Sequence, residues 1–176
     1  NATVTYPANF MLIASMNPCP CGNYGSKDRE CKCSASQINK YLSKLSGPIM
    51  DRIDIHIEVD NVTYDQLKSQ TEEEGSIEIK KRVDKAREIQ LERFKNDKNF
   101  SNAKMSVAQT KKYCQLDDVG QQLSKSAFER LKLSARAHDR LLRVARAIAD
   151  LDGKEGIEAK HIAEAISYRS LDRKYF

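Results

Sequence analysis

The chain has 176 residues, of which 40% are hydrophobic and 31% charged, and its formal net charge is +5. This composition excludes a disordered chain and allows one full domain or two small ones. No apolar run is as long as a membrane span and the N-terminus has no signal-peptide pattern, so we expect a cytoplasmic protein with no membrane partner.

Residues 1–60 show the pattern of an α/β fold. Residues 10–14 are apolar at every position, which is typical of a strand covered on both faces. Residues 53–59 alternate between apolar and polar side chains, as in a strand with one buried face. The elements predicted in chain order are a strand within 8–16, a Pro/Gly/Cys-rich loop over 18–33, a short helix over 36–45 that Gly47 and Pro48 end, and a strand over 53–59.

Residues 76–176 carry helical patterns only, and the polar stretch 61–75 is predicted to be the linker before them. Ser76 is expected to cap a long helix. The residues expected on the inner side of this helix are Ile79, Val83, Ala86 and either Leu91 or Phe94. The remaining predicted helices cover 106–115, 119–132, 134–152 and 158–170.

Positive charge gathers at the start of this helical part. Residues 76–113 contain eleven basic and five acidic side chains, whereas residues 1–60 contain six of each. The excess indicates a polyanionic partner such as DNA. Charge alone equally fits the solvated face of a long helix.

Four of the five cysteines form two close pairs in the loop over 18–33, with the pattern C-x-C-x9-C-x-C at Cys19, Cys21, Cys31 and Cys33. Two such pairs can place four thiolates tetrahedrally around Zn2+. A C-x-C pair is tighter than the usual C-x2-C, so free thiols in a reducing compartment remain the alternative.

Three strings together resemble one family. They are ASMNPCPCG over 14–22, SGPIMDRID over 46–54 and SARAHDRLLRVARAIADL over 134–151. In order and spacing they are similar to the C-terminal part of the AAA+ ATPase branch that includes magnesium chelatase, and more closely to its ComM (competence, YifB-type) members. The resemblance implies a mostly α-helical chain, in which a remnant of the AAA+ α/β core (1–60) is followed by an all-helical lid (76–176).

Asn17 matches the sensor 1 position of this family. One short amide offers a donor and an acceptor, so it can bond both a γ-phosphate and the attacking water. The alternative is an asparagine that starts a turn with Pro18.

Arg52 matches the arginine finger, which in this family acts on the ATP of a neighbouring subunit. A guanidinium offers several donors to the charge that builds on the transferred phosphoryl group. The resemblance therefore implies a ring, and we expect a homohexamer. The alternative is a surface ion pair with Asp51.

Arg136 matches sensor 2. If Ser134 caps the helix, Arg136 lies in its first turn. The helix dipole disfavours a cation there, but the dipole and the guanidinium together stabilise a bound anion. Arg140 and Arg143 follow Arg136 at helical spacing, so the three arginines form one stripe along the helix. Arg140 and Arg143 are interpreted as ion-pair residues. The neighbouring apolar stripe, expected in the core, consists of Ala137, Leu141, Val144, Ile148 and Leu151.

The resemblance implies that the full-length protein is an ATP- and Mg2+-dependent, DNA-translocating helicase of the ComM type, with Asn17, Arg52 and Arg136 as its catalytic residues. Asn17 and Arg136 would also bind the nucleotide. The chain has no G-x-x-x-x-G-K-[ST] phosphate loop, so alone it is expected to be inactive. The alternatives are a motor subunit that inserts Mg2+ into a porphyrin, against which the cysteine loop argues, and a non-catalytic metal-binding helical module.

Overall fold

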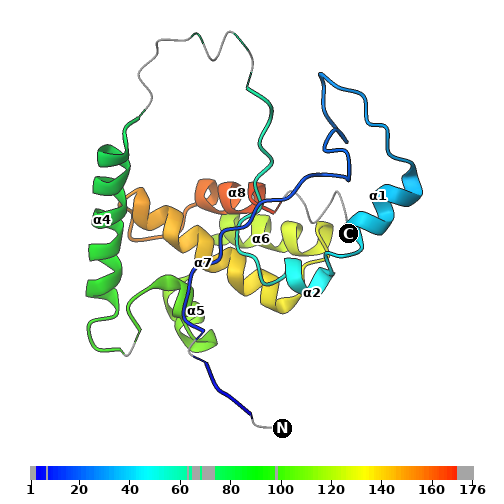
Figure 1. Ribbon diagram of the computed structural model, residues 1–176. Coiled ribbons are helices and arrows are strands. Elements are labelled where there is room, and N and C mark those ends of the chain that lie inside the picture. Colours follow the sequence, from blue (N-terminus) through cyan, green and yellow to red (C-terminus); the bar gives the residue numbers. More distant parts are fainter. Residues whose placement is uncertain are drawn as a thin grey trace. The chain divides into compact units, whose positions relative to one another are not determined.

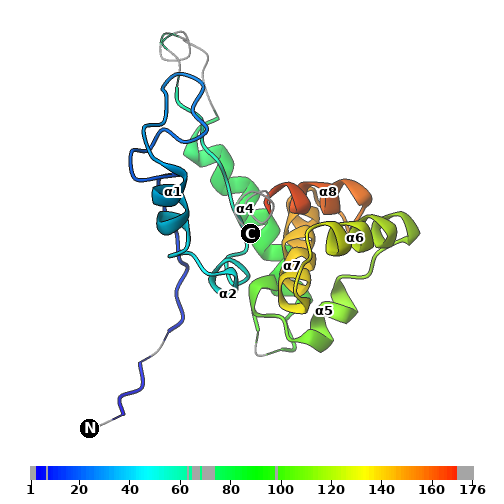
Figure 2. The ribbon, with the colours of Figure 1, turned by 90° about the vertical axis from the view of Figure 1, so that its right-hand side faces the viewer.

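The computed structural model describes residues 3–6, 8–62, 64, 68, 74–97 and 99–169. The chain divides into two compact units, Asn1–Lys44 and Leu45–Phe176 (Figures 1 and 2). The domain limits predicted at residues 60 and 76 stay a prediction, because most of the linker predicted over 61–75 lies outside the described residues. Among the described helices, none combines the length and apolar character that crossing a membrane requires.

The described residues of the first unit contain one helix, α1 (Ala35–Leu42). Ser34 begins it with a capping box, since its hydroxyl accepts from the Gln37 amide while the Gln37 side chain accepts from the Ser34 amide. The helix ends before Gly47 and Pro48, which were predicted to stop it. Those two residues instead begin α2 (Gly47–Met50) in the second unit, where Pro48 is tolerated because the first turn needs no donor from it.

The two predicted strands are absent from the described residues, so this part of the prediction is wrong. Residues 8–16 and 53–59 run without helix or ladder. The side chains of Phe10, Met11, Leu12 and Ile13 are between 69% and 83% exposed. A strand needs a ladder of hydrogen bonds to a neighbouring strand, and no described segment forms such a ladder with either stretch.

The second unit is a helical bundle, as predicted. Its elements after α2 are α4 (Ser76–Arg93), the 3-10 helix η1 (Asn102–Lys104), α5 (Val107–Tyr113), α6 (Asp118–Arg130), α7 (Ala135–Leu151) and α8 (Ala159–Ser167). Local sequence sets several of the helix starts. Ser106, Asp117 and Ser134 each accept a hydrogen bond from the backbone amide three residues on.

Helix α7 lies at the centre of the bundle and packs against α4, α5, α8 and η1 (Figures 1 and 2). Its residues Ala137, Leu141, Ala145 and Ala149 are at most 1% exposed. Val144 and Ile148 pack against the same core, but Leu151, predicted to belong to it, is 52% exposed. Small residues along one face let the neighbouring helices approach closely, which is why one helix can serve as the hub.

A buried ionic network joins α4 to α7. Asp150 is 1% exposed and accepts two hydrogen bonds from Arg93, at 2.8 and 2.5 Å. Asn102 and Arg146 also donate to it, at 2.7 and 3.1 Å. Arg146 further donates to backbone carbonyls of the turn after α7. The carboxylate is therefore satisfied on every side, as a buried charge requires.

Helix α4 differs from its prediction at its N-terminal half. Gly75, and not Ser76, is the N-cap. Ala86 and Phe94 are buried as expected, whereas Ile79 and Val83 are 44% and 45% exposed. The apolar spacing identified the correct face, but the other helices of the bundle cover only the C-terminal half of it.

Candidate functional site

Asn17 lies where the extended stretch of the first unit meets the cysteine loop. Its side chain is exposed and lines a shallow, open cavity of about 390 Å³ together with Ser15, Met16 and Tyr41. The turn that follows is closed by a 3.0 Å bond from the Gly22 amide to the Cys19 carbonyl. Gly22 has φ +81° and faces Asn17, so that a Cβ there would stand 3.9 Å from the Asn17 amide carbon. The loop thus packs directly behind the proposed sensor.

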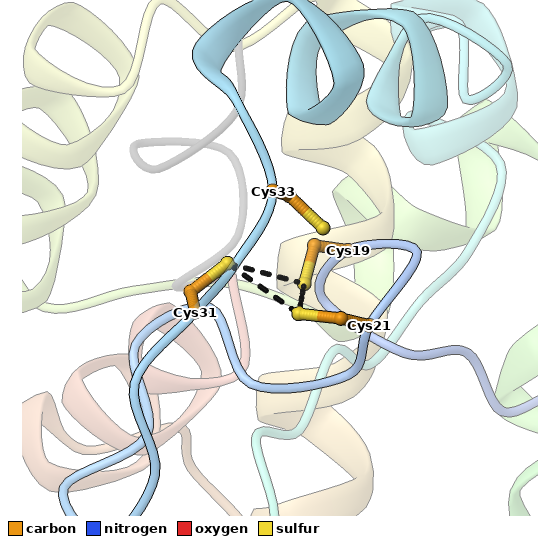
Figure 3. Close-up of side chains that lie close together, drawn as sticks. All are labelled: Cys19, Cys21, Cys31 and Cys33. Carbon is orange, nitrogen blue, oxygen red and sulfur yellow. Dashed lines mark hydrogen bonds between the residues drawn. The ribbon is translucent and has the colours of Figure 1, made fainter.

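The four cysteines of this loop converge (Figure 3). The sulfur of Cys19 is 3.4 Å from that of Cys21 and 3.7 Å from that of Cys31, and the sulfurs of Cys21 and Cys31 are 3.6 Å apart. Cys33 completes a group whose sulfurs all lie within 4.8 Å of one another. A tetrahedral Zn2+ with bonds of about 2.3 Å places its sulfurs about 3.8 Å apart. The donor set and its spacing fit a tetrathiolate metal site.

Backbone amides favour ionised sulfur in this group. Hydrogen bonds from the backbone of Asn23 and then of Lys32 lower the pKa of Cys21 to about 6. The backbone of Cys33 acts in the same direction on Cys31, but desolvation and the neighbouring thiols outweigh it and raise the pKa of Cys31 to about 12. Four adjacent thiolates repel one another, so full ionisation requires a cation among them.

Arg52 follows α2 in the second unit and is exposed. Its guanidinium donates a 2.6 Å hydrogen bond to the Pro48 carbonyl, four residues back. A guanidinium has five donors, so this bond fixes the side chain while other donors remain for an anion. The predicted alternative was an ion pair with Asp51. No Arg52–Asp51 pair occurs in the described part of the chain, where Asp51 lies 3.9 Å from Arg169 instead.

Arg136 lies in the first turn of α7, as predicted. The hydroxyl of Ser134 caps this helix by accepting from the Ala137 amide at 3.1 Å. Arg136 is exposed, and over the described ranges no hydrogen bond or ion pair engages its guanidinium. An exposed cation at the positive end of a helix is the combination expected of an anion-binding position.

The three predicted catalytic residues are divided between the two units. Asn17 belongs to the first unit, whereas Arg52 and Arg136 belong to the second. Within the described part of the second unit, no hydrogen bond links Arg52 to Arg136. Their convergence on one nucleotide therefore stays a prediction for an assembled protein.

Sequence reasoning missed the residues that hold the segment around Arg52. Arg140 binds Asp54, and the buried Arg169 donates to the Ile53 carbonyl. Arg140 had been interpreted as an ion-pair residue, which is confirmed, but its partner could not be named. Arg169 stands among other charged residues near the C-terminus, and nothing in the local pattern marked it.

Two of the three histidines take structural positions. His138 bonds the Ser124 hydroxyl at 2.8 Å, and burial lowers its pKa. His161 accepts from the Glu158 amide through Nδ1 and bonds Asp152 through Nε2, so neither ring nitrogen is available to a metal. Asp152, Glu158 and His161 are near one another, but they form a helix-start network and not a ligand set.

Comparison with known proteins assigns the family. Residues 73–169 match the family described as magnesium chelatase, subunit ChlI C-terminal, and residues 1–67 match magnesium chelatase, subunit ChlI. The chain belongs to the magnesium chelatase-like AAA+ family. It is a ComM/YifB-type member, which confirms the resemblance drawn from its three strings.

Among the relatives is the competence protein ComM of Haemophilus influenzae, with 39% identity over 175 residues, which are 98% of this chain and 33% of that protein. The uncharacterized protein YifB of Escherichia coli is 40% identical over 174 residues, again 98% of this chain and 33% of the relative. An uncharacterized protein of Mycobacterium tuberculosis is 33% identical over 164 residues. The chain therefore spans about a third of the length of the curated relatives it matches.

Proposed function

We propose that this chain supplies the sensor and finger residues of an AAA+ ATPase that hydrolyses ATP with Mg2+. Family membership supports the enzyme class. The observation that carries the assignment to residues is Arg136, an exposed cation in the first turn of a helix already capped by Ser134. At such a position, the guanidinium and the helix dipole both stabilise a bound anion, such as the terminal phosphates of a nucleotide.

Arg52 would act as the arginine finger across a subunit interface. Its exposure and its single intramolecular bond to Pro48 leave it able to reach an anion on another chain. A finger that works in trans requires a ring, which we take to be a homohexamer. Asn17, exposed beside the shallow cavity of the first unit, would orient the attacking water as sensor 1.

The full-length protein would use this ATPase to move along DNA. The excess of six positive charges in residues 76–113 supports a polyanion partner. Lys80, Arg82 and Lys95 are 60% to 72% exposed, although each also pairs with an acidic side chain. The relative from H. influenzae carries the name competence protein ComM.

The deciding experiment measures ATP hydrolysis by the full-length protein with and without DNA. We expect stimulation by DNA, and we expect Arg52→Ala to remove hydrolysis while nucleotide binding persists. Lys125→Ala, which removes an exposed cation of α6, is the matched control and should behave as wild type. If hydrolysis by Arg52→Ala were unchanged, the assignment of Arg52 as the arginine finger would be wrong.

The second candidate is a chelatase motor, and the matches to ChlI domains favour it. The two functions share the proposed ATPase residues. Stimulation of hydrolysis by a porphyrin and chelatase partner subunits, with no response to DNA, would select this candidate instead.

The cysteine loop would hold one Zn2+ through four thiolates. Sulfur separations of 3.4, 3.6 and 3.7 Å support this proposal. Metal analysis of the purified protein should give about one zinc per chain. Cys31→Ser should lose most of it, whereas Cys114→Ala, which alters a buried thiol of the helical unit, should retain it.

A further inference from the structure

The positive charge of residues 76–113 is concentrated at their C-terminal end. Residues 76–97, which form α4 and the turn after it, contain seven basic and five acidic side chains. Residues 98–116 contain four lysines and no acidic side chain. This second stretch includes η1 and α5, so most of the excess charge lies on these two short helices and not on α4.

The described lysines of this second stretch have no acidic partner. Lys104, Lys111 and Lys112 are exposed, and in the described part of the chain no ion pair includes any of them. In α4, by contrast, Lys80 pairs with Asp84. Lys111 and Lys112 lie in the last turn of α5, where the helix dipole favours cations. A polyanion that binds η1 and α5 therefore displaces no ion pair seen there, whereas on α4 it competes with acidic side chains.

Two aromatic rings lie among these lysines. Phe100 is 52% exposed, and the Nζ of Lys104 lies 4.6 Å from the centre of its ring. The Nζ of Lys112 lies 4.9 Å from the centre of the Tyr113 ring. That ring also packs edge-on against Phe94, with the ring centres 5.6 Å apart. Such pairs bring together the two groups that hold a single nucleic-acid strand, which are cations for the phosphates and ring faces for the bases.

A hydrogen bond brings the two lysine–aromatic pairs to one surface. Asn99 donates from Nδ2 to Oε1 of Gln109 at 2.7 Å, which ties the residue before Phe100 to the first turn of α5. Gln109, Lys112 and Tyr113 stand at i, i+3 and i+4 on this helix, so they share one of its faces. The loop that carries Phe100 therefore lies against the face of α5 that carries the second pair.

Helix α7 supports η1 and α5. Arg143 of α7 donates to the Ala103 carbonyl at 3.2 Å and to the Thr110 hydroxyl at 3.3 Å, so one side chain holds both elements. Thr110 is 2% exposed, and its hydroxyl donates to the Ser106 carbonyl at 3.1 Å. The backbone that carries the lysines is therefore held by buried contacts, which lowers the entropy lost when a ligand binds.

We propose that η1, α5 and the loop before η1 form a binding surface for a single DNA strand. Its phosphates contact Lys104, Lys111 and Lys112, and one of its bases stacks on the exposed part of the Phe100 ring. A single strand fits better than a duplex, because the bases of a duplex are stacked on one another and offer no free face to a side chain. The inference rests on the proposed function, in which the full-length protein moves along DNA, and it adds the surface and the form of the DNA.

Anisotropy of a fluorescent oligo-dT, titrated with the full-length protein over a range of salt concentrations, tests the role of the lysines. Lys111→Gln with Lys112→Gln should lower the affinity about tenfold at 0.1 M salt. The slope of log K against log[salt] should fall by about 1.4, because each contact with a single-strand phosphate contributes about 0.7. The matched control is Lys125→Gln with Lys154→Gln, which removes the same charge from two lysines that pair with acidic side chains. It should leave affinity and slope unchanged, and equal losses in the two double variants would overturn the proposed surface.

Phe100→Ala tests stacking separately from charge. This variant should lose between about fivefold and a hundredfold in affinity for oligo-dT, with the salt slope unchanged. Its affinity for a duplex of the same length should not change, and Phe100→Tyr, which keeps a ring, should bind as wild type does. The thermal midpoints of both variants should match that of wild type, because Phe100 is exposed. Equal losses for oligo-dT and duplex would mean that the ring does not stack on a base, and the assignment to a single strand would be wrong.

The outcomes also separate this surface from the proposed function. If inorganic polyphosphate displaces oligo-dT at an equal phosphate concentration and Phe100→Ala weakens neither, the surface is a general polyanion site and the inference is wrong. If Lys111→Gln with Lys112→Gln binds as wild type does, while DNA stimulates hydrolysis and Arg52→Ala abolishes it, the surface is overturned and the proposed function stands. If the wild-type protein neither binds DNA nor responds to it, the proposed movement along DNA fails first and the surface fails with it.

Discussion

The two units of the chain acquire their order in different ways. In the helical unit, α7 and its neighbours enclose a core whose buried members include Phe94, Leu141 and Ile162. In the described part of Asn1–Lys44, Cys19 is the only buried residue, and α1 buries none. Apolar burial therefore stabilises the helical unit, whereas the first unit has little apolar burial to stabilise it.

This contrast indicates what replaces a core in the first unit. Between α1 and the extended stretch, the contacts that draw the loop together are those among the cysteine sulfurs and a few turn hydrogen bonds. A small fold without a core depends on a crosslink such as a metal. Asn17 packs against this loop at Gly22, so the position of the proposed sensor depends on the crosslink as well.

The largest expected effect is that of metal removal, which should act on one unit only. A strong chelator should abolish protection from hydrogen exchange across the loop over 18–33, because apparent zinc affinities of tetrathiolate sites are about 10 kcal/mol or more. The thermal midpoint of the helical unit should not move. If the chelator unfolded both units together, the contrast between them would be wrong, because the two units would then unfold in one cooperative transition.

The next largest effect concerns the buried network of the helical unit. Asp150→Ala leaves Arg93 and Arg146 without their carboxylate and should lower the free energy of unfolding of this unit by about 3–5 kcal/mol, measured by denaturant titration. Asp84→Ala on α4 removes an exposed pair with Lys80 and should cost no more than about 0.5 kcal/mol. A loss below about 1 kcal/mol for Asp150→Ala would mean that the network does not join α4 to α7.

A smaller effect is expected from a glycine of the cysteine loop. Gly22→Ala places a side chain at φ +81°, where an L residue is strained by about 1–2 kcal/mol, and the affinity for zinc should fall about tenfold in a competition titration. Gly47→Ala is the matched control, because open space surrounds that position. Equal affinities in the two variants would show that the loop adapts without metal loss.

The smallest effect is a pH dependence of the helical unit. Hydrogen bonds from Lys160 and then from His161 lower the pKa of Asp152 from 3.8 to about 2. A carboxyl whose pKa is lowered by folding stabilises the fold above its unfolded pKa, and this contribution is lost as the pH falls through the folded value. The stability difference between wild type and Asp152→Asn should therefore narrow between about pH 4 and pH 2, in denaturant titrations at each pH. A stability difference that stays constant with pH would show that the hydrogen bonds from Lys160 and His161 do not depend on the charge of the Asp152 carboxylate.

Much of the helical unit was predictable because its signals are local. The apolar spacing of Ala137 and Leu141, preceded by Ser134, identified α7 and its cap, and similar patterns identified α5, α6 and α8. The extent of packing was not predictable in the same way. Ile79 and Val83 follow the correct spacing, but periodicity identifies a face and does not tell where its partner ends.

The remaining differences involve contacts distant in sequence. The patterns at 8–16 and 53–59 describe faces suited to a sheet, and no pattern within a strand shows that a neighbour is present. Arg93 and Asp150 are separated by 57 positions, so their pairing had no local signal. For the candidate site, the cysteine spacing correctly predicted the approach of the four sulfurs, whereas the metal and the convergence of Asn17, Arg52 and Arg136 stay predictions.

The central position of α7 has a consequence for sequence change. Each inserted or deleted residue rotates the remainder of an α-helix by about 100°. Arg136, Arg140 and Asp150 all lie on this one helix, so a single insertion between the first and the last would turn one end away from its partners. We therefore expect homologous chains to vary in side chain along this stretch but to keep its number of residues constant, with gaps confined to the loops on either side.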